Sequence, residues 1–428
     1  MKLLHVINNV WSTPDLRRKI IFTAVILFIF RFANFIPLPG VNAEGLRALV
    51  NSNQLLGLLD IFSGGTLTGF SIVALSVFPY INASIIMQLM TMAIPSLEAL
   101  SKEGEYGRRK INQYTRLLTV PLAAMQAYGV VIYLSKSQGL IEISSPLHLV
   151  AMVVTLTAGT MFVMWLGELI TESGLGNGIS VIIFAGIVGR LPVVLGQTAA
   201  LFDPENFVNL LLAISAGLAV TAAVVFVNEA MRMIQVQYAR RVRPDGSTAT
   251  GQSTYLPLRV NQAGVIPIIF ASSLLLIPGL IATFLTTVGT GLAQDVSSAV
   301  NNFLQNTLYY GGTYFVLTVL FTFFYTAVTF NPDKISEEIK KYGGFIPGIR
   351  PGRPTADYLN YILTRITVIG ALFLGSVAVL PFIMQEITGI STLVVGGTGL
   401  LIIVSVALES MKQLQSMLVM RHYEGFLK

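Results

Sequence analysis

The stretch that decides the fold is LVAMVVTLTAGTMFVMWLGELI, residues 149–170, in which Glu168 is the one charged side chain. About 20 mostly apolar residues form a helix long enough to cross the hydrocarbon core of a bilayer. The whole chain has the same character, since 54% of its 428 residues are hydrophobic and 11% are charged. A soluble domain carries about 25% charged residues. The sequence therefore predicts an integral membrane protein.

Nine further stretches have similar length and hydropathy, and with residues 149–170 they predict an all-α polytopic protein with ten transmembrane helices. They are residues 20–36, 70–94, 114–134, 177–195, 207–228, 264–285, 313–331, 359–383 and 392–408. We expect two halves of five spans each, residues 1–195 and 196–428. Because five is an odd number, two related halves would face opposite ways across the membrane, as in many transport proteins.

The basic residues predict the orientation. With both termini in the cytoplasm, 21 of the 27 Lys and Arg residues fall on the cytoplasmic side and three, Arg47, Lys136 and Arg190, fall in external loops. The remaining three, Arg31, Arg116 and Arg365, lie in or beside spans. This asymmetry is the one that the positive-inside rule requires. The 21 are Lys2, Arg17, Arg18, Lys19, Lys102, Arg108, Arg109, Lys110, Arg232, Arg240, Arg241, Arg243, Arg259, Lys334, Lys340, Lys341, Arg350, Arg353, Lys412, Arg421 and Lys428.

The segment at about 55–65, LLGLLDIFSGG, is neither a span nor an ordinary loop. Its apolar part has about nine residues, roughly 14 Å of helix, which is too short to cross a bilayer. One interpretation is an amphipathic helix in the outer interface. The other is a re-entrant segment inside a protein-lined cavity, where non-spanning backbone is tolerated at membrane depth.

Two long cytoplasmic loops are basic, at about 231–262 and about 331–357. Basic loops often do no more than set topology. The Gly and Pro residues between Gly343 and Pro354 nevertheless predict a protruding hairpin. A basic tip is suited to an acidic partner or to the phosphates of ribosomal RNA.

Several classes of function find no support in the residues. The chain has no cysteine and three scattered histidines, and it lacks phosphate-binding, nucleophile-elbow and zinc-protease motifs. We therefore expect no enzyme, no metal and no cofactor. A secondary transporter for a small solute remains an alternative, although such proteins usually place an ionisable residue near the midplane. A structural scaffold would not need a short re-entrant segment.

Six motifs make the chain resemble the SecY family, the central subunits of the bacterial Sec protein translocase. They are KEGEYGRRKINQYTR at 102–116, MWLGE at 164–168, GLGNGIS at 174–180, QSTYLPL at 252–258, NQAGVIP at 261–267 and PGIRPG at 347–352. The resemblance covers essentially the whole chain. It implies a protein-conducting channel of the bacterial inner membrane, with a central pore between the halves. A lateral gate would open between the second-to-third and seventh-to-eighth spans.

The resemblance also implies roles for individual residues. The pore ring would be Val77, Ile81, Ile179, Ile183, Ile269 and Ile402, and the lateral gate would contain Asn82, Gln126 and Asn261. The plug would include Leu58, Leu59, Ile61, Phe62, Ser63, Gly64 and Gly65. Docking of partners would use Arg240, Arg241 and Arg350. The implied partners are the small membrane subunits SecE and SecG, the SecA ATPase motor, the ribosome, an unfolded preprotein with its signal sequence, and membrane lipid.

Overall fold

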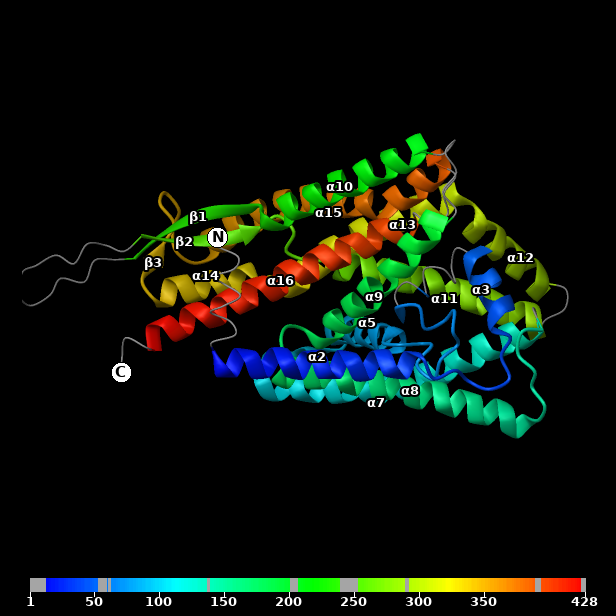
Figure 1. The fold of residues 1–428 in the computed structure, drawn as a ribbon. Coiled ribbons are helices and arrows are strands. Elements are labelled where there is room, and N and C mark those ends of the chain that lie inside the picture. Colours follow the sequence, from blue (N-terminus) through cyan, green and yellow to red (C-terminus); the bar gives the residue numbers. More distant parts are fainter. Residues whose placement is uncertain are drawn as a thin grey trace, which may run out of the picture.

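A computed structural model describes residues 13–52, 60, 63–136, 139–200, 207–238, 253–288, 292–388 and 394–424. The fold is mostly helical, and its long helices run roughly along one common direction (Figure 1).

Every predicted span overlaps a helix, in whole or in part. These helices are α2 (Pro14–Asn34), α5 (Phe78–Ala93), α7 (Glu105–Lys136), α8 (Pro146–Ser173), α9 (Gly178–Ala200), α10 (Phe207–Glu229), α11 (Ile266–Val288), α13 (Thr307–Thr329), α15 (Arg353–Thr388) and α16 (Val394–Glu424). Within the described residues, four shorter helices lie between them, namely α3 (Ala43–Ser52), α6 (Pro95–Lys102), α12 (Leu292–Gln305) and α14 (Pro332–Lys341).

Not all of these helices meet a strict test for crossing a membrane. Within the described residues, four segments are long and apolar enough, namely Glu105–Ser135, Pro146–Ser173, Thr307–Lys341 and Arg353–Met384. A fifth is reached if α5 and α6, which are bent by 100° at their junction, count as one span. The structure supports a helical membrane protein, and the number of ten spans stays a prediction.

The second predicted span, residues 70–94, is only partly helical. Residues 64–77 form a run of turns, and α5 begins at Phe78 with Pro79 in its first turn. Phe70 and Ser76 have positive φ angles of 39° and 47°, which a helix does not tolerate. The backbone of this segment is paired locally, with Ile72 N–H donating to Ile36 O at 3.0 Å and Leu38 N–H to Phe70 O at 2.9 Å. The span was predicted too long because hydropathy does not report backbone turns.

The fold is not all-α, because a three-stranded sheet with the order β2-β1-β3 lies beside α14 (Figure 1). Strands β1 (Met231–Tyr238) and β2 (Ser253–Arg259) pair antiparallel, and the short β3 (Gly344–Phe345) joins the other edge of β1. Between Gly343 and Pro354, where a protruding hairpin was predicted, the second loop forms β3 and then turns that lead into α15. In the first long loop, β1 and β2 pair antiparallel. In β1, Ile234 and Val236 are buried while Met231, Arg232, Met233 and Gln235 are exposed, the alternation expected of a strand with one wet face.

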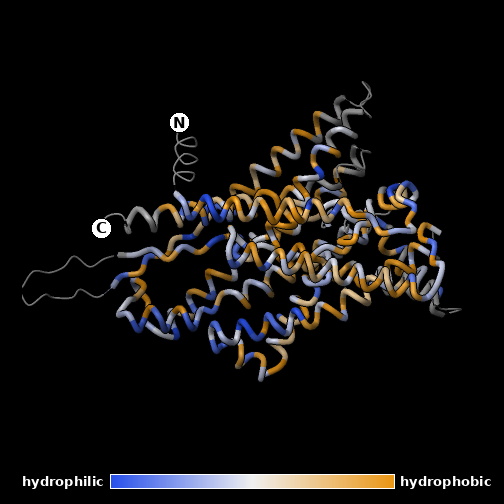
Figure 2. The backbone as a smooth tube through the Cα atoms, turned by 60° about the horizontal axis from the view of Figure 1, so that its bottom comes forward, coloured by the Kyte–Doolittle hydropathy of each residue, from blue (hydrophilic) through white to orange (hydrophobic). Residues whose placement is uncertain are grey.

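The charged elements gather at one end of the molecule. The sheet, α14, the beginning of α2 and the end of α16 lie together, and α3 and α12 lie at the opposite end (Figure 1). Hydrophobic residues follow the helices between these two ends (Figure 2). The basic residues predicted to be cytoplasmic in α2, α14 and α16 therefore share one end, whereas Arg47 in α3 lies at the other.

The main hydrophobic core contains helices from both halves of the sequence. The helix α11 packs against α5 and α7, and α16 packs against α9. The largest buried aliphatic and aromatic cluster draws side chains from α2, α5, α8, α9, α10, α11, α13, α15 and α16. Helices that are distant in sequence are therefore held together mainly by side-chain contact.

Candidate functional site

The six residues predicted to form a ring meet in this largest cluster. Five of them are buried core members, with side-chain exposures between 1% for Ile402 and 8% for Ile269, and Ile179 is partly buried against them. They come from four different helices, since Val77 is the N-cap of α5 and the others lie in α5, α9, α11 and α16. Their role as a pore constriction stays a prediction.

Local geometry explains how these side chains come to face inward. Ile179 and Ile183 are four residues apart in α9 and so lie on one face of the helix. Val77 and Ile81 are also four apart, and Ile81 N–H donates to Val77 O at 3.0 Å in the first turn of α5. The turns that precede Val77 therefore set the point at which this face begins.

Only the last part of the predicted plug can be placed. Leu58, Leu59, Ile61 and Phe62 lie outside the described residues. Ser63 is buried, and Gly64 lies so close to α9 that a side chain on it would collide with the backbone of Gly186. The end of the segment is thus inside the protein, next to the helix that carries Ile179 and Ile183.

Polar residues that the resemblance assigns to the lateral gate are not joined to one another by any described hydrogen bond. Asn82 is 3% exposed, and neither polar atom of its side chain has a partner among the described residues. The side-chain oxygen of Gln126 is also buried without one. Asn261 instead donates to Asn228 Oδ1 at 2.8 Å, and Asn228 donates to Ser405 Oγ at 2.8 Å. Asn261 is therefore hydrogen-bonded to α10 directly and to α16 through Asn228.

Of the three predicted docking arginines, only Arg350 falls within the described residues. It is exposed in the turn between β3 and α15, and its carbonyl accepts a hydrogen bond from Thr355 Oγ1 at 2.9 Å. Arg240 and Arg241 lie outside the described residues. The tip that carries Arg350 rests on a second hydrophobic cluster, in which Ile346 packs with Ile234 and Leu359.

Two arginines have partners that sequence reasoning did not find. Arg190, counted above with the external loops, lies inside α9 and forms an ion pair with the buried carboxylate of Asp60. Arg31, in the last turn of α2, donates to Gly64 O at 3.4 Å. A hint was available, since single charges of opposite sign within apolar segments tend to pair with each other.

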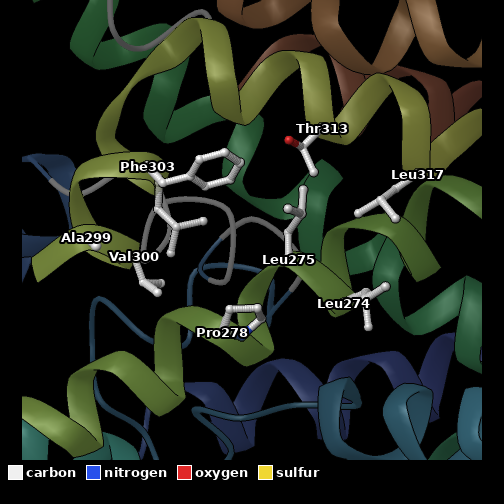
Figure 3. Close-up of a pocket in the computed structure, with 9 residues that line it drawn as sticks. Leu274, Leu275, Pro278, Ala299, Val300, Phe303, Thr313 and Leu317 are labelled. Carbon is white, nitrogen blue, oxygen red and sulfur yellow. The ribbon is translucent and has the colours of Figure 1, made fainter. Parts of the chain in front are cut away.

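Two further observations limit other kinds of site. A pocket of about 430 Å³ lies between α11, α12 and α13 and is lined by apolar residues such as Leu275, Pro278 and Phe303, with Thr313 at its edge (Figure 3). None of the six ring residues lines it. Among the described residues, no three His, Cys, Asp or Glu side chains are grouped in a way that could hold a metal ion.

Known proteins share both the sequence and the fold. The family description SecY matches residues 71–411. The protein translocase subunit SecY of Streptomyces scabiei is 44% identical over 100% of both chains, and that of Mycobacterium bovis is 45% identical over 97% of this chain and 98% of its own.

The fold agrees with solved channels. A protein-conducting channel aligns with a TM-score of 0.64 and 18% identity over 94% of this chain and 92% of its own. Sec61 from a canine ribosome-channel complex aligns with a TM-score of 0.61 over the same shares. At 18% identity these likenesses establish the fold alone, whereas the full-length relatives establish the family. The chain therefore belongs to the SecY family of protein translocase subunits.

Proposed function

We propose that this protein is the channel through which unfolded secretory polypeptides cross the bacterial inner membrane and from which membrane segments leave sideways into lipid. The observation that carries the proposal is the convergence of six aliphatic side chains from four helices in one buried cluster. Such side chains cannot replace the hydration shell of an ion, so they would block ions by dewetting. They would nevertheless yield to an extended chain, because the helices that carry them can separate.

The membrane arrangement follows from the charge distribution. Ten spans would form two inverted halves, residues 1–195 and 196–428, with the sheet, α14 and both termini on the cytoplasmic side. The packing of α11 on α5 and α7 supports a lateral gate between the second and third predicted spans on one side and the seventh on the other. Asn82, Gln126 and Asn261 would then lie near the contact that opens.

A signal sequence supplies enough free energy to bias such a gate. A ten-residue apolar segment that enters lipid gains roughly 3 to 6 kcal/mol, at about 0.3 to 0.6 kcal/mol per residue. Moving a two-state equilibrium from almost closed to almost open takes about 5.5 kcal/mol. Because the two values are comparable, a signal sequence that prefers the open state could open the channel.

Directional movement would come from partners on the cytoplasmic side. The exposed Arg350 and the basic loop with Arg240 and Arg241 would dock the SecA motor or the ribosome. Small membrane subunits, SecE and SecG, would pack against the helices. The family assignment lends no support to the alternative of a small-solute transporter, and the channel subunit itself is proposed to have no enzymatic activity.

Crosslinking tests the proposed path directly. The chain contains no cysteine, so single cysteines at Ile81, Ile183 or Ile402 would be unique. A secretory chain stalled during export should crosslink to all three. The matched control is a cysteine at Leu218, which is 67% exposed on α10. Crosslinks to Leu218 but to none of the three buried positions would exclude the proposed pore.

Deleting residues 57–65 separates the two interpretations of the short segment. A plug seals the resting channel, so its removal should raise the ion conductance of vesicles that contain the purified protein. An unchanged conductance would support an interfacial helix instead.

A further inference from the structure

The base of the proposed plug is held by a buried ion pair. Asp60 has no solvent-exposed surface, and its carboxylate contacts the guanidinium of Arg190, whose side chain is 21% exposed. Separating a buried ion from its charged partner is costly, because no water replaces the lost interaction. This pair is therefore a strong point of attachment between residue 60 and α9.

Asp60 is also tied tightly to the residues that follow it. Thr68 N–H donates to Asp60 Oδ1 at 2.9 Å, and Gly65 N–H donates to the Asp60 carbonyl at 2.8 Å. Ser63 Oγ donates to the same carbonyl at 3.1 Å. These bonds connect Asp60 to residues 63–68. An interaction that fixes the position of Asp60 therefore also fixes the position of this turn.

A second arginine holds this turn from another helix. Arg31 in α2 donates to Gly64 O at 3.4 Å, and its guanidinium fits against Gly189, where a side chain would collide with it. On the side of α9, Gly64 and Gly186 approach so closely that neither has room for a Cβ atom. The turn is thus bound to both α2 and α9.

The ion pair continues the face of α9 that carries two ring residues. Ile179, Ile183, Gly186 and Arg190 follow the spacing i, i+4, i+7 and i+11, which places them on one stripe of a helix. Arg190 lies seven residues beyond Ile183, about 10 Å farther along the axis at 1.5 Å per residue. The same face therefore presents first an apolar seal and then a charged attachment.

We propose that Arg190 and Arg31 are positioning residues that hold the base of the plug in the resting channel, and that the Asp60–Arg190 pair must separate when the plug leaves. This inference rests on the proposed channel function. According to this proposal, the ion pair stabilises the closed state of the channel in addition to the aliphatic ring.

The decisive experiment compares three variants in reconstituted vesicles, with resting ion conductance as the measurement. Arg190→Gln leaves a fully buried carboxylate unpaired and should raise the conductance roughly tenfold to a hundredfold. Asp60→Asn should have a smaller effect, because Arg190 keeps some access to water and the bond from Thr68 can persist. The double variant Asp60→Asn/Arg190→Gln leaves no unpaired buried charge but also lacks the attachment, so its conductance should lie between that of Arg190→Gln and that of Arg47→Gln.

A second measurement follows the turn itself. Ser63 is 4% exposed, so Ser63→Cys should resist a membrane-impermeant maleimide in the otherwise unchanged protein and react at least several-fold faster when combined with Arg190→Gln. The control Arg47→Gln removes an exposed charge from α3 and should change neither measurement. If Arg190→Gln does not yield folded protein, Asp60→Asn and the double variant carry the comparison.

Two results would overturn the proposal. One is a conductance of Arg190→Gln, or of Asp60→Asn, equal to that of Arg47→Gln. The other is a double variant whose conductance equals that of Arg47→Gln, since the closed state would then not depend on the ion pair. If a stalled chain still crosslinks to a cysteine at position 183 in these cases, the proposed channel function is supported and only the proposed role of the ion pair is excluded.

Discussion

The aliphatic ring residues and the three-stranded sheet both centre on buried aliphatic side chains, yet they are held together differently. In the ring, four helices meet through side chains alone, and each helix satisfies its own backbone hydrogen bonds. In the sheet, β1 and β2 pair through their backbones from Met231–Arg259 to Gln237–Ser253. Helices that meet only through side chains can part without breaking backbone bonds. We therefore expect the ring to be the part that opens and the sheet to be a rigid support for docking.

The largest effect should come from the exposed arginine on the rigid support. Arg350→Glu reverses a charge at the tip, and like charges brought together at an interface cost several kcal/mol, so motor-driven export should fall on the order of a thousandfold. Export of a secretory protein into membrane vesicles measures this. Lys334→Glu, an equal charge reversal at an exposed site of α14, is the control. Normal export by Arg350→Glu would remove this residue from the docking site.

The next effect concerns the stability of the sheet. Ile234→Ala deletes a side chain that is 5% exposed in the cluster beneath β1, and such truncations cost about 2 to 5 kcal/mol. Hydrogen exchange should show faster opening of β1, while the resting ion conductance stays unchanged. Met233→Ala truncates an exposed neighbour in the same strand and should change little. A raised conductance in Ile234→Ala would show that sheet and ring are coupled.

A polar side chain in the ring should affect the seal without changing docking. Ile183→Asn places an amide at a site that is 3% exposed, at a cost of roughly 1 to 3 kcal/mol if the amide finds no partner. Admission of water relieves that cost, so the resting conductance should rise about tenfold. Ile183→Leu keeps the site apolar and should remain closed. Equal conductance in both variants would contradict sealing by dewetting.

The smallest effect tests the support at one helix end. The side chain of Asn331 accepts a hydrogen bond from Lys334 N–H at 3.1 Å and caps α14. Asn331→Ala should destabilise α14 by about 1 kcal/mol, measured as faster hydrogen exchange in its first turn. Glu337→Ala, at an exposed site within the same helix, should leave that turn unchanged. Loss of export in Asn331→Ala would show that docking depends on the first turn of α14, which contradicts the small effect expected here.

The charged residues show which features could be predicted from the sequence and which could not. The gathering of basic residues at one end followed from hydropathy and the positive-inside rule, because both act on single segments. The positions of Arg31 and Arg190 did not follow, since their partners near residue 60 are distant in the chain. Likewise, alternation within β1 was readable in principle, but the pairing of β1 with β3 depends on the fold of a loop more than 100 residues away.

By itself, the sequence determined that the protein is a helical membrane protein, which side its basic segments favour and which family it resembles, because these properties are carried by local hydropathy and contiguous motifs. Tertiary structure alone decided that Val77, Ile81, Ile183, Ile269 and Ile402 share one buried cluster, that residues 64–77 turn before α5 begins, and that Asp60 meets Arg190. The physical reason is that apolar burial is non-directional, so a sequence specifies which side chains leave water but not which of them meet.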